Sequence, residues 1–516
     1  MAFDCCGLFV VSNIYQVCFL AITLICACGV KYVQLRRASG SPEVRYSGGF
    51  KSTARNNVTY RLYKLVRAPT LESEIAFCYE VKAVECAKEV KRLLNRKGIE
   101  ARYIVEYPDV YAIRLNDGNL PEWFRKSFSE IKPRSVREVL GFDEGDLRYR
   151  FGGRGQGKWP YDVRKRKPYW CPALRRLSIE VYYERLEYWK ALERLFNRHV
   201  DGVVREFVEL VPRSLKDIWD LDRGGVKLAL LDGKTLKSKL REIAEIKSRS
   251  YNGLSTLQLV NGDTLLEVVG GREAEYIANL LSGLLFRFGC IPYYVELPTT
   301  HAEYLKLPRA LYVGVGLKKV GEEYAKGLAV LMTGRGNVVG YVDKEFHVRS
   351  RSMEFLEERE LDEFVNEIKA KLESYRNNMS KDPELIVVVR SRRFHEIEWR
   401  TLRKNFASHW LRLSSKELLL MSTFKLKNIT IGPGRTVEVG RRLMSGGLHG
   451  VWLVQLSKFK SAVKVSYFYT GNDATLPLAA YIYLRSLDFT SLTQNRTSLP
   501  PVKYARNYLK WMYLSQ

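Results

Sequence analysis

The sequence predicts an α/β fold, and three observations support that class. Hydrophobic residues make up 46% of the 516-residue chain and aromatic residues 12%, as in globular domains. Strand-like and helix-like runs alternate over residues 224–300 as β-α-β-α-β, which implies a parallel sheet covered by helices. A second α/β unit begins near residue 309. A chain of this length is expected to form two to four domains.

The first unit has five predicted elements, each recognised by its apolar spacing and its turn residues. The strands are GVKLALLDG at 225–233, TLQLV at 256–260 and IPYYVEL at 291–297, and the helices are TLKSKLREIAEIKSRS at 235–250 and EAEYIANLLSGLLFRFG at 273–289. The second helix ends at a glycine, which is a common helix stop. These elements give the β-α-β-α-β order.

The second unit has a different order. RALYVGVGL at 309–317 is followed by three strand-like runs between 328 and 351, a helix at 361–378 and the buried-type strand LIVVVRS at 385–391. A further helix is expected at 394–406. Consecutive antiparallel strands, then a helix, then another strand is the order of RNase H-like domains.

The first 58 residues contain two unusual segments. No charge occurs between Asp4 and Lys31, so residues 7–30 are long enough to cross a bilayer, and segment 1–38 is a possible transmembrane segment. The cations that follow it would keep the rest of the protein in the cytoplasm. A buried strand-helix unit and a misplaced start codon are the two alternatives. Residues 39–58 are rich in Ser, Gly and charge, which predicts a linker.

Residues 59–214 are predicted to form an N-terminal α/β region with a long helical stretch at 178–210. Within this region, residues 148–176 carry ten cations interleaved with Tyr, Phe and Trp. Cations suit phosphates and rings suit bases, so this segment is a candidate nucleic-acid contact. The densest run is Arg164, Lys165, Arg166 and Lys167. The alternative is a solvated basic loop.

Charge and cysteine content narrow the class of partner. Lys and Arg number 84 against 57 Asp and Glu, a formal net charge of +27. Such an excess indicates a polyanion, with nucleic acid first and an anionic membrane surface second. The nine cysteines form no CxxC pair, so we expect reduced thiols, with neither a zinc site nor a disulfide framework.

Three residues of the first unit could converge on one anion. Lys247 lies near the end of a predicted helix, Gln258 lies in the next strand, and Arg287 ends the following helix. Lysine, arginine and an amide are the charge-assisted donors that a phosphate requires. The alternative is that Gln258 is a surface amide and Arg287 a helix-face cation.

These residues and their context resemble the Argonaute/Piwi family. The resemblance covers roughly residues 215–516 and implies a Rossmann-like MID domain at 215–308, followed by an RNase H-like PIWI domain at 309–516. It implies that Lys247, Gln258 and Arg287 hold the 5′ phosphate of a guide strand, with Asn279 in support. The family usually has tyrosine where this chain has Ile243.

The resemblance also implies a degenerate catalytic site. VVVRSRRFHEIEW matches the middle PIWI strand and LPPVKYARNYLKWM matches the C-terminal helix. The family's carboxylate positions are then Gly316, Ser391 and Arg506, so two metal ions cannot be held there and slicing is expected to be absent. No cofactor is required for catalysis, and Mg²⁺ is an option only at the guide 5′ phosphate.

The function implied is that of a truncated, inactive prokaryotic Argonaute. Such a protein binds a short 5′-phosphorylated guide, usually RNA, and pairs it with complementary target DNA or RNA. It acts in host defence against invading nucleic acid through an effector protein encoded nearby. Two alternatives remain open. One is an RNase H-like metal-dependent nuclease using other acids, such as Glu396 or Glu398. The other is a membrane-tethered basic scaffold.

Overall fold

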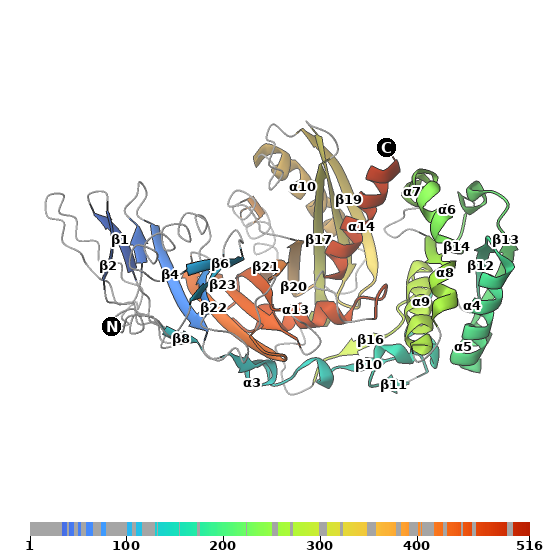
Figure 1. Cartoon of the computed structure of the whole chain (residues 1–516), viewed down its shortest axis with the longest axis horizontal. Coiled ribbons are helices and arrows are strands. Elements are labelled where there is room, and N and C mark those ends of the chain that lie inside the picture. The colour runs from blue at the N-terminus through green and yellow to red at the C-terminus, as the bar shows by residue number, and fades with distance from the viewer. Residues whose placement is uncertain are drawn as a thin grey trace. The chain divides into compact units, whose positions relative to one another are not determined.

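The computed structural model describes most of the chain beyond residue 132 and isolated strands before it (Figure 1). The described residues are the strands between 34 and 131 and then residues 133–515, except for gaps at 154, 173–175, 223, 250–255, 269–271, 299–306, 320–323, 348–357, 378–382, 392–400, 403, 405–416, 427–430, 445–446, 457–460 and 493–498. The chain divides into two compact units, the first comprising residues 1–139, 425–444 and 449–466. The second comprises residues 140–424, 445–448 and 467–516.

Unit one is described mainly as β-structure. Its N-terminal strands are β1 (Gln34–Ala38), β2 (Ser41–Arg45), β3 (Phe50–Ser52), β4 (Val58–Leu65), β5 (Glu74–Cys78), β6 (Ala101–Val105), β7 (Val110–Leu115) and β8 (Ser129–Ile131). Strands β3-β4-β5-β7-β6 form one sheet and β8 pairs with β4. Strands β2 and β3 fall inside 39–58, the segment predicted to be a linker. The hydrophobic run at 7–30 lies outside the described residues.

Unit two contains a four-stranded parallel sheet with the order β13-β12-β14-β15. The strands are β12 (Leu177–Tyr183), β13 (Val208–Ser214), β14 (Lys227–Leu231) and β15 (Leu257–Asn261). Every residue of β14 is buried, as expected for a central strand with helices on both faces. The parallel sheet predicted over this part of the chain is therefore confirmed.

The predicted helical stretch at 178–210 is wrong in its first and last parts. Residues 177–183 form β12, where alternate side chains are buried at the start of the strand, and 208–214 form β13. The β-branched and aromatic residues of SIEVYY favour a strand, and sheet pairing overrides the helical pattern that continues beyond them. Only α4 (Leu186–His199) and α5 (Gly202–Phe207) between these strands are helical.

Four more helices follow along the chain, two between β14 and β15 and two after β15. They are α6 (Gly233–Ser238), α7 (Leu240–Arg249), α8 (Gly262–Glu267) and α9 (Glu273–Arg287). Asp232 and Asn261 cap α6 and α8 by accepting hydrogen bonds from backbone N–H groups of the first turn. Buried Ile243 and Ile246 pack α7 against Leu231 and Leu257 of the sheet. This packing fixes the end of α7, where Lys247 lies.

The strand predicted at 291–297 exists but joins a different sheet. Strand β16 (Tyr294–Glu296) pairs antiparallel with β10 (Arg148–Arg150), which also pairs with β11 (Gln156–Gly157). Helix α9 is followed by Gly289, whose φ of +80° is the left-handed conformation typical of the residue after a helix end.

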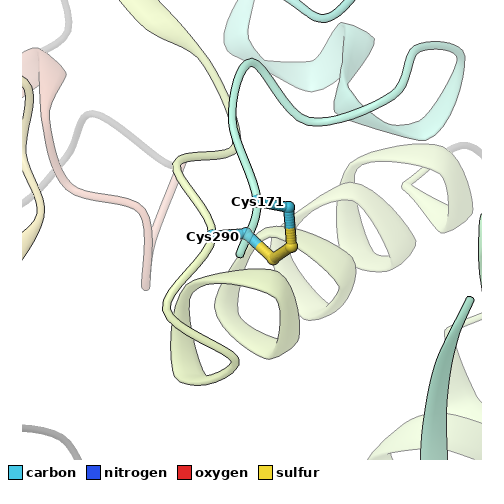
Figure 2. Close-up of a disulfide and its surroundings, with 2 residues drawn as sticks. All are labelled: Cys171 and Cys290. Carbon is cyan, nitrogen blue, oxygen red and sulfur yellow. A yellow bond between two sulfur atoms is a disulfide. The ribbon is translucent and has the colours of Figure 1, made fainter. Parts of the chain in front are cut away.

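A disulfide between Cys171 and Cys290 ties these two parts of unit two together (Figure 2). The expectation that the cysteines are all reduced is therefore wrong for this pair. No local sequence pattern indicated this pairing, because the two cysteines are 119 residues apart. Backbone hydrogen bonds between Trp170 and Ile291, of 3.2 and 2.8 Å, hold the adjacent segments side by side.

The sheet that begins with β17, called the second sheet below, follows the predicted strand-helix-strand order. Strands β17 (Ala310–Lys319), β18 (Tyr324–Thr333) and β19 (Val338–His347) are antiparallel, α10 (Glu358–Asn377) follows, and β20 (Leu385–Ser391) and β21 (Glu417–Lys425) pair in parallel. Val365 and Ile368 of α10 pack on Val313 and Val388 in one core. The RNase H-like order is confirmed, and the predicted helix at 394–406 lies largely outside the described residues.

The chain ends in two helices, α13 (Leu476–Ser486) and α14 (Pro500–Ser515). Helix α14 lies along β17 (Figure 1) and also contacts α7. Close approach to β17 is possible because Gly314 has no side chain: a Cβ there would lie 2.1 Å from the Pro501 carbonyl carbon. Helix α14 is therefore placed between the second sheet and the helix that carries Lys247.

Candidate functional site

Three segments of unit two supply the predicted anion-binding side chains. Lys247 lies in the last turn of α7, Gln258 is the second residue of β15, and Arg287 is the last residue of α9. Lys247 faces inward because α7 is amphipathic and its other buried residues, Ile243 and Ile246, lie on the same side. Its side chain is only 7% exposed although it carries an ammonium group.

The structure brings Gln258 and Arg287 together at Gly283, and Lys247 lies close enough for Arg287 to lower its pKa. Lys247 Nζ donates a 3.1 Å hydrogen bond to the carbonyl oxygen of Leu257, which precedes Gln258. Arg287 Nη1 donates a 2.9 Å hydrogen bond to the Gly283 carbonyl. A Cβ at Gly283 would lie 3.0 Å from Gln258 Oε1 and 3.5 Å from Arg287 Nη1. The absence of a side chain there lets the amide lie against α9, and we call these residues the Lys247–Gln258–Arg287 cluster.

The C-terminal helix contributes two residues that sequence analysis missed. The Lys247 ammonium lies 4.6 Å from the centre of the Trp511 ring, within the range of a cation–π interaction. Lys510, beside Trp511, is close enough to lower the pKa of Lys247. Trp511 also packs against the apolar core between α7 and the parallel sheet. No local pattern could have shown these contacts, because they join distant segments.

Burial shifts the pKa values of both cations downward. Burial lowers the pKa of Lys247 to about 7, and the positive charges of Arg287 and Lys510 add to this effect. Burial likewise lowers the pKa of Arg287 to about 10, against a smaller opposing effect of Tyr504. A bound anion would reverse both shifts, because it stabilises the charged forms.

Two polar atoms of the cluster are buried and have no hydrogen-bond partner within the described part of the chain. They are Oε1 of Gln258 and Nε of Arg287. Most buried polar atoms in native proteins do have partners, so two such atoms in adjacent side chains require an explanation. An N–H of a guanidinium calls for an acceptor. Rotating the Gln258 amide by half a turn would present its N–H₂ group in place of the oxygen.

Asn279, the predicted supporting residue, makes its hydrogen bonds to backbone groups. Its Nδ2 donates a 2.9 Å hydrogen bond to the Glu275 carbonyl, and its Oδ1 accepts a 2.5 Å hydrogen bond from the Leu492 backbone. Both ends of the amide are therefore engaged with backbone. In this position Asn279 connects α9 to the segment that precedes α14.

Gly316, Ser391 and Arg506, the residues expected at the family's carboxylate positions, lie at the sheet that contains β17 and β20 and at α14. Val315 and Arg390 are the last residues that pair between β17 and β20, and Gly316 and Ser391 are the residues that follow them. A Cβ on Gly316 would lie 3.1 Å from Ala505 Cβ, next to Arg506 on α14. Arg506 is exposed. Glu396 and Glu398, the acids named for the nuclease alternative, lie outside the described residues.

The run from Arg164 to Lys167 divides into two kinds of residue. Arg164 is half-buried, and its Nη1 donates a 3.1 Å hydrogen bond to the His199 carbonyl at the end of α4. Arg166 lies over Gly155, where a Cβ would be 2.6 Å from its Nη1. Lys165 and Lys167 are exposed. Only the two lysines are therefore freely presented to a ligand.

The cluster does not by itself suit a metal ion. Magnesium requires oxygen ligands, whereas the side chains here are two cations and one amide. Among the residues that the structure describes, no group of three or more His, Cys, Asp or Glu could hold a metal ion. The same part of the chain contains no helix that is long and apolar enough to cross a membrane.

Comparisons with known proteins agree on the fold. No protein-family model matches the sequence, and no curated protein matches it. Among solved structures, A. aeolicus Argonaute aligns at a TM-score of 0.50 and 14% identity, covering 94% of this chain and 77% of that one. Drosophila Piwi aligns at a TM-score of 0.51 and 14% identity, covering 93% and 77%.

A third solved structure, Marinitoga piezophila Argonaute in complex with a 5′ OH guide RNA, aligns at a TM-score of 0.48 and 13% identity, covering 94% of this chain and 79% of that one. The two structures with higher scores span almost all of this chain. The chain therefore has the fold of the Argonaute and Piwi proteins.

Proposed function

We propose that the chain binds the 5′ phosphate of a short guide nucleic acid in the Lys247–Gln258–Arg287 cluster. The observation that carries this proposal is the buried Lys247 and the half-buried Arg287, which lie beside two buried polar atoms that have no partner among the described residues. Burying like charges together opposes folding, so the arrangement needs a compensating ligand. The resemblance to Argonaute proteins supports a nucleic-acid phosphate as that ligand.

The chemistry of the cluster fits a terminal phosphate well. Arg287 offers a planar set of N–H donors and Lys247 a point charge, and both make strong hydrogen bonds to phosphate oxygens. Lys510 adds positive charge from α14. A terminal phosphate carries close to two negative charges at neutral pH, whereas an internal phosphodiester carries one. The cluster should therefore prefer a strand end to a strand interior.

The proposal extends to the strand that pairs with the guide. The net charge of +27 suits a guide–target duplex held by its backbone, with base pairing supplying sequence recognition. We propose a small RNA guide and a DNA target. The roles in defence and in signalling to an effector protein belong to the same proposal and follow from the resemblance alone.

We further propose that this protein does not cut its target. Gly316, Ser391 and Arg506 occupy the three expected carboxylate positions, and none can ligate a divalent metal ion as a carboxylate does. Arg506 would add positive charge where metal ions would bind. Any Mg²⁺ at the guide end would have to be held by phosphate oxygens, so no step is assigned to it.

Binding of 18-nucleotide RNA with a 5′ phosphate or a 5′ hydroxyl tests the proposal. Fluorescence anisotropy should show that the phosphorylated strand binds more tightly. The Lys247→Met, Arg287→Met double variant should bind the phosphorylated strand about 100-fold or more weakly and lose this preference, since two charged hydrogen bonds at roughly 1.5–3 kcal/mol each are removed. Methionine retains side-chain length, which limits loss of packing.

A matched control has the same loss of charge on exposed helices. Lys234→Met with Arg205→Met removes two exposed cations of unit two, on α6 and α5. This control should bind the phosphorylated strand more weakly by a small factor and keep the preference for it. Thermal denaturation verifies that each variant is folded. Equal affinities of the folded wild-type protein for both strands would overturn the proposal.

A further inference from the structure

The basic segment forms a small substructure that the proposed guide-end site does not use. We call residues 147–172 the basic module. Strands β10 and β11 form a hairpin, and the hairpin tip is tied to the rest of the module by a 3.0 Å hydrogen bond from Gly152 N to Lys167 O. A 3₁₀ helix at Pro160–Arg164 packs against α9. The module is thus an ordered structure and not a loose basic loop.

At the end that bears Trp170, the backbone of the module is hydrogen-bonded to the segment that follows α9. Tyr169 N and Trp170 N donate hydrogen bonds of 3.1 and 3.2 Å to the carbonyls of Pro292 and Ile291. The Tyr169 ring stacks on Tyr294 at 5.3 Å. The Cys171–Cys290 disulfide follows immediately (Figure 2). Trp170 therefore projects from a backbone fixed on both sides.

Two tryptophans of the module are about half exposed to solvent. Trp159 is 46% exposed and Trp170 is 51% exposed. Tryptophan carries a large apolar surface, and a fold that could bury it would gain stability by doing so. Two half-exposed rings on one firmly built module indicate a surface that is covered when a partner binds.

Exposed cations accompany these rings. Arg148, Lys158, Lys165 and Lys167 are exposed, and Lys158 Nζ lies 5.9 Å from the centre of the Trp159 ring. In the same module, Asp162 is half-buried and lies at the first turn of the 3₁₀ helix. The balance of exposed charge is therefore positive.

We propose that the basic module binds single-stranded nucleic acid, with Lys165 and Lys167 contacting phosphates and Trp159 and Trp170 stacking on bases. Exposed aromatic rings favour binding of a single strand, because its bases are free to stack on them, whereas the bases of a duplex are already stacked on one another. This is a second binding surface, separate from the Lys247–Gln258–Arg287 cluster. It would hold an unpaired stretch of guide or target strand.

The test uses a fluorescently labelled 20-nucleotide single-stranded DNA with a 5′ hydroxyl. Without a terminal phosphate the strand cannot use the guide-end site as proposed, so the two proposals can fail independently. Trp159→Ala and Trp170→Ala should each weaken binding about fivefold or more, the usual range for losing one stacked base. Trp170→Phe should retain most of the affinity, because a smaller ring still stacks.

Trp219→Ala is the matched control. Trp219 is 41% exposed but lies outside the module, in the 3₁₀ helix Ile218–Asp222, and its loss should leave the affinity unchanged. Lys165→Ala with Lys167→Ala should lower the slope of log affinity against log salt by roughly 1.4, at about 0.7 per phosphate contact on a single strand. Lys234→Ala with Lys237→Ala, on exposed positions of α6, controls for charge.

Three results would overturn the proposal. In the first, the tryptophan variants bind the single strand as wild type does. In the second, a duplex of the same sequence binds as tightly as the single strand, which would mean that charge alone acts. In the third, the variants lose binding to vesicles of anionic phospholipid but not to DNA, which would make the rings a membrane contact.

Discussion

The Lys247 ammonium lies 4.6 Å from the centre of the Trp511 ring, so the last helix of the chain covers the innermost cation of the candidate site. This contact couples the parallel sheet, through α7, to the helix that packs along β17. It also explains part of the burial that lowers the pKa of Lys247.

Removing the ring should expose Lys247 to water. Trp511→Ala is expected to raise the pKa of Lys247 toward its ordinary value, because burial is the largest cause of its depression. The lost packing against the core should lower the free energy of unfolding by about 1–3 kcal/mol. Urea denaturation measures the stability. Trp219→Ala, which removes a more exposed ring, should have a smaller effect.

Stability should depend on pH through Lys247. Its pKa is about 7 in the folded protein and 10.5 ordinarily, so between these values the unfolded chain binds more protons. The free energy of unfolding contributed by this group therefore rises with pH above about 7, by up to ~1.4 kcal/mol per unit. Arg287 would act in the same direction only above pH 10, where its own lowered pKa lies.

Urea titrations at pH 7, 8 and 9 check this expectation against Lys247→Met. The variant has no ammonium group there and should show a flatter dependence. If both proteins gain stability in parallel, then Lys247 is not the group responsible. Affinity for a 5′-phosphorylated strand should move the other way in wild type, weakening as pH rises and Lys247 loses its proton.

Gly283 should matter for binding more than for stability. Alanine at this position would place its Cβ 3.0 Å from Gln258 Oε1, which the amide can relieve only by moving away from α9. Helix propensity favours alanine by about 1 kcal/mol and offsets part of the strain. We expect affinity for the phosphorylated strand to fall several-fold with stability within about 1 kcal/mol of wild type. Calorimetry and denaturation on the same preparation separate the two effects.

The Cys171–Cys290 disulfide should stabilise unit two. Reduction should lower the free energy of unfolding by roughly 2–4 kcal/mol, the usual range for a disulfide that closes a long loop. Cys171→Ser should lower the stability equally and should not respond to reductant, whereas Cys86→Ser should remain sensitive. Equal melting temperatures with and without reductant would show that the bond does not form in solution.

Sequence patterns predicted those elements whose signal is local. The buried strand at 227–231 and the three residues of the cluster follow from apolar runs and from charges at characteristic positions. Strand β12 was missed because its alternating pattern runs directly into that of α4. The contact between Lys247 and Trp511 and the pairing of Cys171 with Cys290 depend on tertiary structure alone, so no spacing could show them.

Replacing Gly316 by aspartate should destabilise the protein without creating a nuclease. Its Cβ would lie 3.1 Å from Ala505 Cβ and 3.2 Å from Leu509 Cδ1, so the carboxylate would enter a surface packed against α14. Overpacking typically lowers stability by about 1–3 kcal/mol, and an unpaired buried carboxylate adds to this loss. Gly316→Ala, which adds the Cβ alone, separates the two contributions.

Urea denaturation gives the stabilities, and incubation with a labelled target, a guide and Mg²⁺ or Mn²⁺ detects cleavage. A stable variant that cuts its target would show that α14 can shift to make room for the carboxylate and that the other metal ligands are already in place. The proposal that Ser391 and Arg506 prevent metal binding would then be wrong.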